Sequence, residues 1–266
     1  MDMITNTYRK GTTIMPKQIA VAGKGGTGKT TLAALIIRYI TEERPGKSIL
    51  AVDADANANL NEALGFDVIN PISDILTETK DPKKVPTGMT KDMFVEYRLH
   101  TALAESDKYD LIVMGNPQGP GCYCFPSDLL RKHLENLRDN YDYVVIDNEA
   151  GLEHLSRRIM SDIDTLLVTS DSSARGVRSA RRVHEIVKSV DLDVKQMGLV
   201  ISRIQKEGDV EALKGEIEKT GLSLLGKIPM DLNVSEFDLK GIPLFDLPAD
   251  SSAYTAVKEM LDKMDI

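Results

Sequence analysis

The segment Gly23-Lys24-Gly25-Gly26-Thr27-Gly28-Lys29-Thr30 has the residue types and spacing needed to bind phosphate. It fits the pattern G-x-x-x-x-G-K-[ST], in which glycines let backbone N–H groups approach phosphate oxygens. The pattern assigns Lys29 to the β- and γ-phosphates and the Thr30 hydroxyl to Mg²⁺. An apolar run precedes the segment and an amphipathic pattern follows it, which an accidental glycine-rich turn would not require. The predicted nucleotide-binding residues of this segment and its neighbour are Gly25, Gly26, Thr27, Gly28, Lys29, Thr30 and Thr31.

Aspartates at the ends of two other apolar runs fit the same chemistry. The run Tyr143–Asp147 ends in an acid, which is the pattern of a strand that places a carboxylate beside Mg²⁺. Two further acids, Asp53 and Asp55, lie at the end of the run Ser48–Asp53. Capping of a helix near residues 57–64 is the alternative role for both, because aspartate is a preferred N-cap residue.

The only two cysteines of the chain, Cys122 and Cys124, lie in the Gly- and Pro-rich segment Asn116–Pro126. A disulfide between them would close a strained ring. Two thiolates supply half of a tetrahedral metal site, and a two-fold dimer would supply all four. Soft thiolates suit Zn²⁺, Ni²⁺, Cu⁺ or an iron–sulfur cluster. Two unreactive cysteines are the alternative, because a lone C-x-C is a weak signal.

An α/β scaffold is needed to bring these residues together. Continuous apolar runs, typical of parallel strands buried on both faces, alternate with amphipathic stretches. We therefore predict a mainly parallel twisted sheet flanked by helices on both faces. The predicted strands are Gln18–Ala22, Ser48–Asp53, Leu111–Gly115, Tyr143–Asp147, Thr165–Thr169, Met197–Ile201 and Ser223–Ile228. The predicted helices are Thr30–Glu43, Arg178–Ser189, Val210–Thr220 and Ser252–Met264, with a helical insertion at Ile69–Lys108 and with Phe237, Leu239 and Leu244 in the core.

The net charge and the hydropathy of the chain indicate which kinds of partner are disfavoured. The 266-residue chain has a formal net charge of −8, and an acidic surface disfavours nucleic acid and anionic membranes. No apolar run approaches the ~18 residues that span a bilayer, and the first residues lack the apolar segment of a signal peptide. We expect a cytoplasmic protein with a disordered extension at residues 1–16 and a single P-loop ATPase domain at residues 17–266.

The loop K-G-G-T-G-K-T-T, with its early lysine Lys24, resembles the deviant Walker A loop of the MinD/ParA/nitrogenase-iron-protein class. The resemblance implies a homodimer in which Lys24 reaches the partner's nucleotide and stabilises charge as an arginine finger does. It also implies that Asp55 orients the attacking water and that Asp53 supports Mg²⁺ beside Thr30 and Asp147. The implied catalytic residues are Lys24, Lys29 and Asp55, and a solvated loop lysine is the alternative for Lys24.

The base pocket follows the pattern of this class only in part. Ser202 stands where the class often has asparagine, so one adenine contact of the class is missing. The segment Gly226–Asp231 (G-K-I-P-M-D) resembles the adenine-side I-P-x-D loop, which implies that Pro229 and Asp231 bind the nucleotide. No N-K-x-D motif for guanine is present, so ATP is favoured over GTP.

Four segments together resemble the CooC/AcsF family, from about Lys17 to the C-terminus: A-V-A-G-K-G-G-T-G-K-T-T, V-D-A-D-A-N-A-N-L, G-C-Y-C and V-V-I-D-N-E-A-G-L-E-H-L-S-R-R. Members of this family are nickel-handling ATPases for the maturation of carbon monoxide dehydrogenase and acetyl-CoA synthase. The resemblance implies that Cys122 and Cys124 bind Ni²⁺, or Zn²⁺ in its place, in a nucleotide-controlled homodimer. It also implies that the dimer delivers nickel to the apo form of one of these two enzymes.

Two other functions remain open at this point. A MinD-like positioning ATPase would need a basic amphipathic C-terminus, whereas the charge of Val257–Ile266 is balanced. An ATP-gated reductase like the nitrogenase iron protein would hold an iron–sulfur cluster between subunits, but that class takes its ligands from well-separated cysteines.

Overall fold

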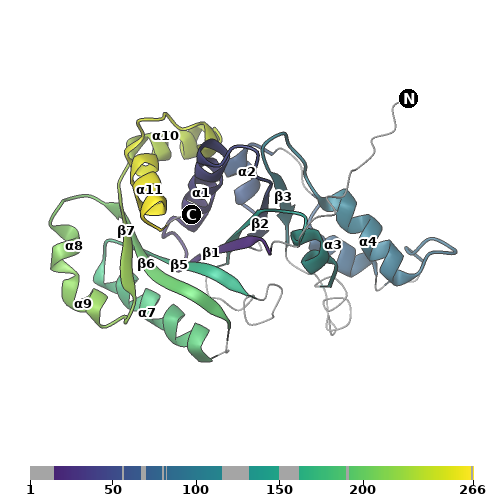
Figure 1. Cartoon of the computed structure of the whole chain (residues 1–266), viewed down its shortest axis with the longest axis horizontal. Helices are drawn as coiled ribbons and strands as arrows, with labels where there is room; N and C mark the ends of the chain where they lie inside the picture. Colours follow the sequence, from purple (N-terminus) through teal and green to yellow (C-terminus); the bar gives the residue numbers. More distant parts are fainter. Residues whose placement is uncertain are drawn as a thin grey trace.

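A seven-stranded sheet in the order β3-β2-β4-β1-β5-β6-β7 runs through the molecule, and every pair of neighbours is parallel (Figure 1). The computed structural model describes residues 15–55, 57–66, 70–79, 81, 83–115, 132–149, 162–189, 192–264 and 266. The strands are β1 (Lys17–Gly23), β2 (Ile49–Ala54), β3 (Asp110–Val113), β4 (Tyr143–Asn148), β5 (Ile163–Asp171), β6 (Val194–Ile204) and β7 (Ser223–Pro229). The predicted parallel sheet is therefore confirmed.

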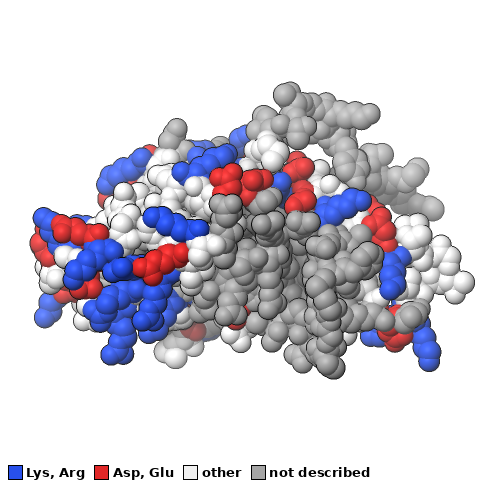
Figure 2. Space-filling view, turned by 90° about the horizontal axis from the view of Figure 1, so that it is seen from below, with Lys and Arg blue, Asp and Glu red and all other residues white. Residues whose placement is uncertain are grey.

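Helices cover both faces of this sheet (Figure 1). One face carries α1 (Lys29–Glu43), α2 (Leu60–Leu64), α10 (Leu232–Lys240), the 3₁₀ helix η1 (Leu244–Asp246) and α11 (Ser252–Lys263). The other carries α3 (Ile72–Glu78), α4 (Lys91–Ala102), α7 (Ala174–Ser189), α8 (Asp209–Ala212) and α9 (Lys214–Glu218), and residues 132–138 are also helical. Lys and Arg side chains gather at the end of the molecule where α7 lies (Figure 2). Within the described ranges, no helix is long and apolar enough to cross a membrane.

Successive residues of each strand supply the two layers of core. In β1, Ile19 and Val21 pack on the α1 side, whereas Ala20 and Ala22 pack on the α7 side. This alternation follows from the strand geometry, in which neighbouring Cβ atoms point to opposite faces. Because all the strands are parallel, their carboxyl ends meet at one edge of the sheet. The phosphate-loop segment therefore meets Asp53 and Asp147 there, each one residue before the end of its strand.

Two local predictions were wrong. The helix expected over Val210–Thr220 is two short helices, because Leu213 adopts φ −92° and ψ −2° and turns the chain between α8 and α9. Leu239, expected in the core, is 86% exposed. It lies two residues, or about 200° of helical rotation, beyond the partly buried Phe237, so α10 points it to solvent. Leu244 is buried as expected, and the insertion near residues 69–108 does contain the helices α3 and α4.

Candidate functional site

The phosphate loop connects the end of β1 at Gly23 to the start of α1 at Lys29. Gly28, the N-cap of α1, has φ 81°, which lies in the left-handed region that glycine adopts without strain. At Gly23, a Cβ atom would lie 2.4 Å from Thr169 Oγ1, so only glycine fits against β5. Glycine is therefore required at Gly28 by its backbone conformation and at Gly23 by the lack of space beside β5.

Side chains of two other strands hold this loop in place. The Thr27 hydroxyl donates to the Lys24 carbonyl at 2.7 Å and lies 2.7 Å from the Thr169 hydroxyl of β5. The Ser202 hydroxyl of β6 donates to the Thr27 carbonyl at 2.8 Å and lies 3.2 Å from the Ser170 carbonyl. From the sequence, Ser202 was expected only to leave out an adenine contact, and no role was predicted for Thr169. The signal for Thr169 was its position, a polar residue at the carboxyl end of a buried strand.

The Thr30 hydroxyl meets the Asp147 carboxylate beside the loop. Thr30 Oγ1 donates to Asp147 Oδ2 at 2.6 Å, and Asp53 is the neighbour of Asp147 in the β2–β4 register. Both aspartates are at most 1% exposed. Asp147 Oδ1 is buried and accepts no hydrogen bond from any described residue. A hydroxyl, an unsatisfied carboxylate oxygen and a second acid form a set of hard oxygen donors that suits Mg²⁺.

Burial shifts the titration of both acids toward neutral pH. It raises the pKa of Asp147 to about 7, helped by the negative charge of Asp53 and opposed by the Thr30 hydrogen bond and the charge of Lys29. Burial also raises the pKa of Asp53 to about 6, against the N–H groups that donate to it. A cation bound beside Asp53 and Asp147 would favour the ionised form of both carboxylates.

Asp53 makes the bond that the capping alternative predicts, whereas the bonds of Asp55 fall before the start of α2. Asp53 Oδ2 accepts from Leu60 N at 2.9 Å at the start of α2, and its Oδ1 accepts from Asp55 N at 3.0 Å. Asp55 Oδ1 accepts from Asn57 N at 2.9 Å and from Asn57 Nδ2 at 3.1 Å. The predicted roles of Asp53 toward Mg²⁺ and of Asp55 toward water stay predictions, and both acids lie at the phosphate-loop edge where those roles require them.

The two loop lysines differ in exposure. Lys29 is 7% exposed, and its charge acts on the buried Asp147. Lys24 is exposed. An exposed lysine at this point of the loop is free to reach a second chain, and that role stays a prediction.

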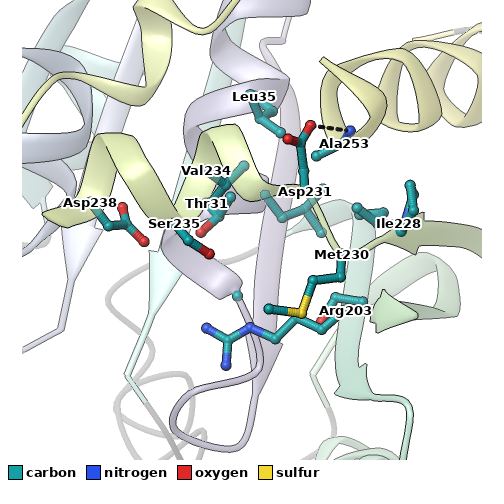
Figure 3. A pocket seen from close by; sticks show the side chains of 14 residues that line it. Thr31, Leu35, Arg203, Ile228, Met230, Asp231, Val234, Ser235, Asp238 and Ala253 are labelled. Atoms are coloured by element: carbon teal, nitrogen blue, oxygen red, sulfur yellow. Dashed lines mark hydrogen bonds between the residues drawn. The ribbon is translucent and has the colours of Figure 1, made fainter. Parts of the chain in front are cut away.

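A cavity of about 260 Å³ lies beside the loop, between α1, α10 and the carboxyl ends of β6 and β7 (Figure 3). It contains Thr31, Pro229 and Asp231, which were all predicted to bind nucleotide. Its other lining residues are Gly28, Leu32, Leu35, Ser202, Arg203, Ile228, Met230, Val234, Ser235, Asp238 and Ala253. A cavity beside a phosphate loop that combines apolar side chains with polar groups suits a purine base.

The carboxylate of Asp231 is used for structure. Its Oδ1 accepts from Asn233 N at 2.8 Å and caps α10. Its Oδ2 accepts from Ser251 Oγ at 2.7 Å, from Ser252 Oγ at 3.2 Å and from Ala253 N at 3.0 Å. Burial opposes ionisation, yet these hydrogen bonds lower the pKa of Asp231. Asp231 therefore fixes α10 and α11 around the cavity, and its contact with nucleotide stays a prediction.

A residue that the sequence did not single out, Arg203, lies at the cavity with Met230 (Figure 3). Its φ of 55° is unusual for a residue other than glycine. The pairing of β6 with β7 shifts register between Ile201 and Ile204, and Met230 N donates to Ile204 O beyond the shift. This irregularity of β6 brings the Arg203 side chain to the cavity. No sequence pattern used above predicts such a bulge.

Cys122 and Cys124 lie outside the described residues, so the thiolate site stays a prediction. In the part of the chain that the structure describes, no group of three or more His, Cys, Asp or Glu side chains is placed to hold a metal ion.

Comparisons with known proteins agree with this site. Residues 19–244 match the family described as the CobQ/CobB/MinD/ParA nucleotide binding domain. An uncharacterized ATP-binding protein of Methanocaldococcus jannaschii is 40% identical over 249 residues, covering 92% of this chain and 97% of that protein. The carbon monoxide dehydrogenase accessory protein CooC of Rhodospirillum rubrum is 28% identical over 246 residues, covering 86% and 90%. The solved MinD cell division protein of Aquifex aeolicus has a TM-score of 0.69 at 23% identity, covering 94% and 96%.

The family match extends over the phosphate loop, the acids of β2 and β4, and the strands that line the base cavity. It confirms the prediction of a MinD/ParA-type P-loop ATPase. The fold, the site and the match together show that the chain belongs to the CobQ/CobB/MinD/ParA nucleotide-binding domain family.

Proposed function

We propose that this chain is an ATP-driven nickel insertase that matures carbon monoxide dehydrogenase or acetyl-CoA synthase as a nucleotide-controlled homodimer. The observation that carries the proposal is the likeness to the CooC accessory protein of Rhodospirillum rubrum, which extends over 86% of this chain. The pair Cys122 and Cys124 adds the soft donors that nickel requires. The cysteine pair has no part in the phosphate-loop pattern that binds nucleotide.

For hydrolysis, we assign roles to the phosphate loop and to the acids beside it. Lys29 and the loop N–H groups hold the triphosphate, while Thr30 and Asp147 would hold Mg²⁺. When bound, Mg²⁺ neutralises charge that develops on the β- and γ-phosphate oxygens. Asp55 orients the attacking water, and Lys24 of the second chain stabilises the transition-state charge.

Dimer closure follows from the position of Lys24. Its charge contacts the other chain's nucleotide only in the closed dimer, so ATP favours closure through contacts that the open state lacks. Closure brings together two copies of Cys122 and Cys124, whose four thiolates hold one nickel ion as cargo. Hydrolysis removes the contact with the γ-phosphate, and the dimer reopens to release the metal to the client enzyme.

Anaerobic size-exclusion chromatography with metal analysis tests this proposal, with and without ATP and Ni²⁺. We expect one nickel ion per two chains when both are present. The double variant C122A/C124A should lose nickel and keep ATP binding. The matched variant K24A keeps both thiols and should bind ATP but fail to hydrolyse it. Unchanged nickel content in C122A/C124A, or a strictly monomeric chain under every condition, would refute the proposal.

A MinD-like positioning role at a membrane receives no support from α11. Its apolar residues Val257, Met260 and Leu261 are at most 1% exposed and pack in the core against α1. The helix therefore has no free apolar face to insert into a bilayer. Sedimentation with anionic liposomes separates the two functions, because the nickel insertase is expected to stay in the supernatant with or without ATP.

A further inference from the structure

Helix α7 concentrates positive charge on a chain of net charge −8. Between Ala174 and Ser189 it has five basic residues and one acid, Glu185. All five basic side chains are exposed, and blue side chains gather at this end of the molecule in Figure 2. We name this surface the α7 basic face, and its members are Arg175, Arg178, Arg181, Arg182 and Lys188.

The helix periodicity separates this face from the core. Val177, Ala180, Val183 and Val187 are at most 6% exposed, and the last three belong to the core on this face of the sheet. The arginines at positions 175, 178 and 182 follow the spacing i, i+3, i+7 and so form one stripe on the opposite side. The stability of α7 therefore comes from its apolar side, and the charged side is not needed for folding.

Within the described ranges, carboxylates pair with only two of the five cations on this face. Arg178 lies 3.6 Å from Glu216 of α9, and Arg181 pairs with Glu185 at 2.9 Å. No carboxylate among the described residues lies within ion-pair distance of Arg175 or Arg182. Like charges three or four residues apart destabilise a helix by about 0.2–0.5 kcal/mol per pair. The face thus keeps unpaired cations at a cost to its own helix.

We propose that the α7 basic face docks an acidic surface of a protein partner. Arginine supplies most of the face, and its planar guanidinium binds carboxylates through two parallel hydrogen bonds. The face is one helix of 16 residues, about 24 Å long, which is the size of a local contact patch. The proposal concerns charge on α7 alone and holds whether or not the chain handles nickel.

Two other polyanions fit this face less well. Glu185 and Glu216 lie among the arginines and would repel the continuous phosphates of a nucleic acid, whereas a protein surface can place cations opposite them. An anionic membrane would need apolar groups beside the cations for stable attachment. Beside the arginines, α7 exposes one large apolar side chain, Ile186, at 37%, while Ala180, Val183 and Val187 are buried in the core. One such side chain is too little apolar surface for stable attachment to a membrane.

The experiment measures fluorescence anisotropy of a labelled oligoglutamate peptide at low salt. We compare wild type with R175E/R182E, which reverses the two unpaired arginines. The matched control is K83E/K91E, which makes the same change in net charge at two exposed lysines near α4 that have no described ion pair. We expect R175E/R182E to weaken peptide binding about tenfold or more and the control to change it less than about threefold.

Thermal melting and ATP binding of both variants verify that each is folded. The proposal is overturned if wild type does not bind the peptide, or if both variants lose affinity equally, because net charge alone would then explain the binding. It is also overturned if a short DNA duplex or phosphatidylserine vesicles bind to wild type more tightly than the peptide at physiological salt.

Discussion

Replacing Asp147 with asparagine should make the metal-free protein more stable, by an amount that grows with pH. Burial raises the pKa of Asp147 from 3.8 to about 7, so the folded state binds this proton more tightly than the unfolded state does. The resulting stability is fully present below pH 3.8 and is lost as pH rises through 7. Asparagine keeps an acceptor for Thr30 and has no charge to bury.

The size of the effect follows from the two pKa values. At about pH 5 only the unfolded state ionises Asp147, which lowers the free energy of unfolding of wild type by about 2 kcal/mol relative to acid pH. At about pH 8 both states ionise it, and the loss levels off at about 4 kcal/mol. The advantage of Asp147→Asn over wild type should therefore grow by about 2–3 kcal/mol across this range. Comparing the two pH values cancels any constant effect of exchanging a carboxylate for an amide.

Urea unfolding in EDTA without nucleotide measures this difference. The matched control is Asp142→Asn, just before the same strand, β4. Burial opposes ionisation of Asp142, but hydrogen bonds from Lys47 and Ser48 lower its pKa. Asp142 therefore contributes stability that is lost only as pH falls through its low folded pKa, and the control should be less stable than wild type by a similar amount at both pH values. An advantage of Asp147→Asn that is equal at about pH 5 and about pH 8 would refute the reasoning.

Three further predictions concern the loop and the core. Gly23→Ala should abolish nucleotide binding and lower the melting temperature, because the new Cβ would lie 2.4 Å and 2.5 Å from the Thr169 side chain and carbonyl; unchanged titration with a fluorescent ATP analogue would contradict this. Ser202→Ala leaves the buried Thr27 carbonyl without its hydroxyl donor and should cost about 1–3 kcal/mol in urea unfolding. A loss below measurement error would show that the hydroxyl does not hold the loop. Leu244→Ala should cost about 2–5 kcal/mol, whereas Leu239→Ala should change stability by less than about 0.5 kcal/mol, and the opposite ranking would disprove the assigned orientation of α10.

The sheet was predictable because its strands are buried on both faces. A strand such as β1 must be apolar at every position, and a continuous apolar run is visible in sequence. The phosphate loop was predictable for a different reason, since its chemistry needs fixed residue types at fixed spacing. The observed strands extend a few residues beyond the predicted ones. In β5 and β6, for example, the hydrogen bonds between strands continue past the apolar run, to Asp171 and Ile204.

The contacts that support the loop were not predictable in the same way. Ser202 and Thr27 are 175 positions apart, and no local pattern indicates that one hydroxyl reaches the other's carbonyl. The orientation of Leu239 failed because α10 has 9 residues and no fully buried position, so its apolar residues do not define a single face. The contact and the side-chain orientation both depend on how distant segments pack together, and the local sequence does not contain that information.

The hydrogen bond from Leu60 N to Asp53 has a mechanical consequence. If the Asp53 carboxylate shifted toward a newly bound cation, it would move away from the first turn of α2, a helix of only five residues. Such a short helix depends on its cap, so filling the cation position would loosen that turn and emptying it would let the turn re-form. The conformation of the adjoining segment, which includes Asp55, would then depend directly on whether the cation is bound.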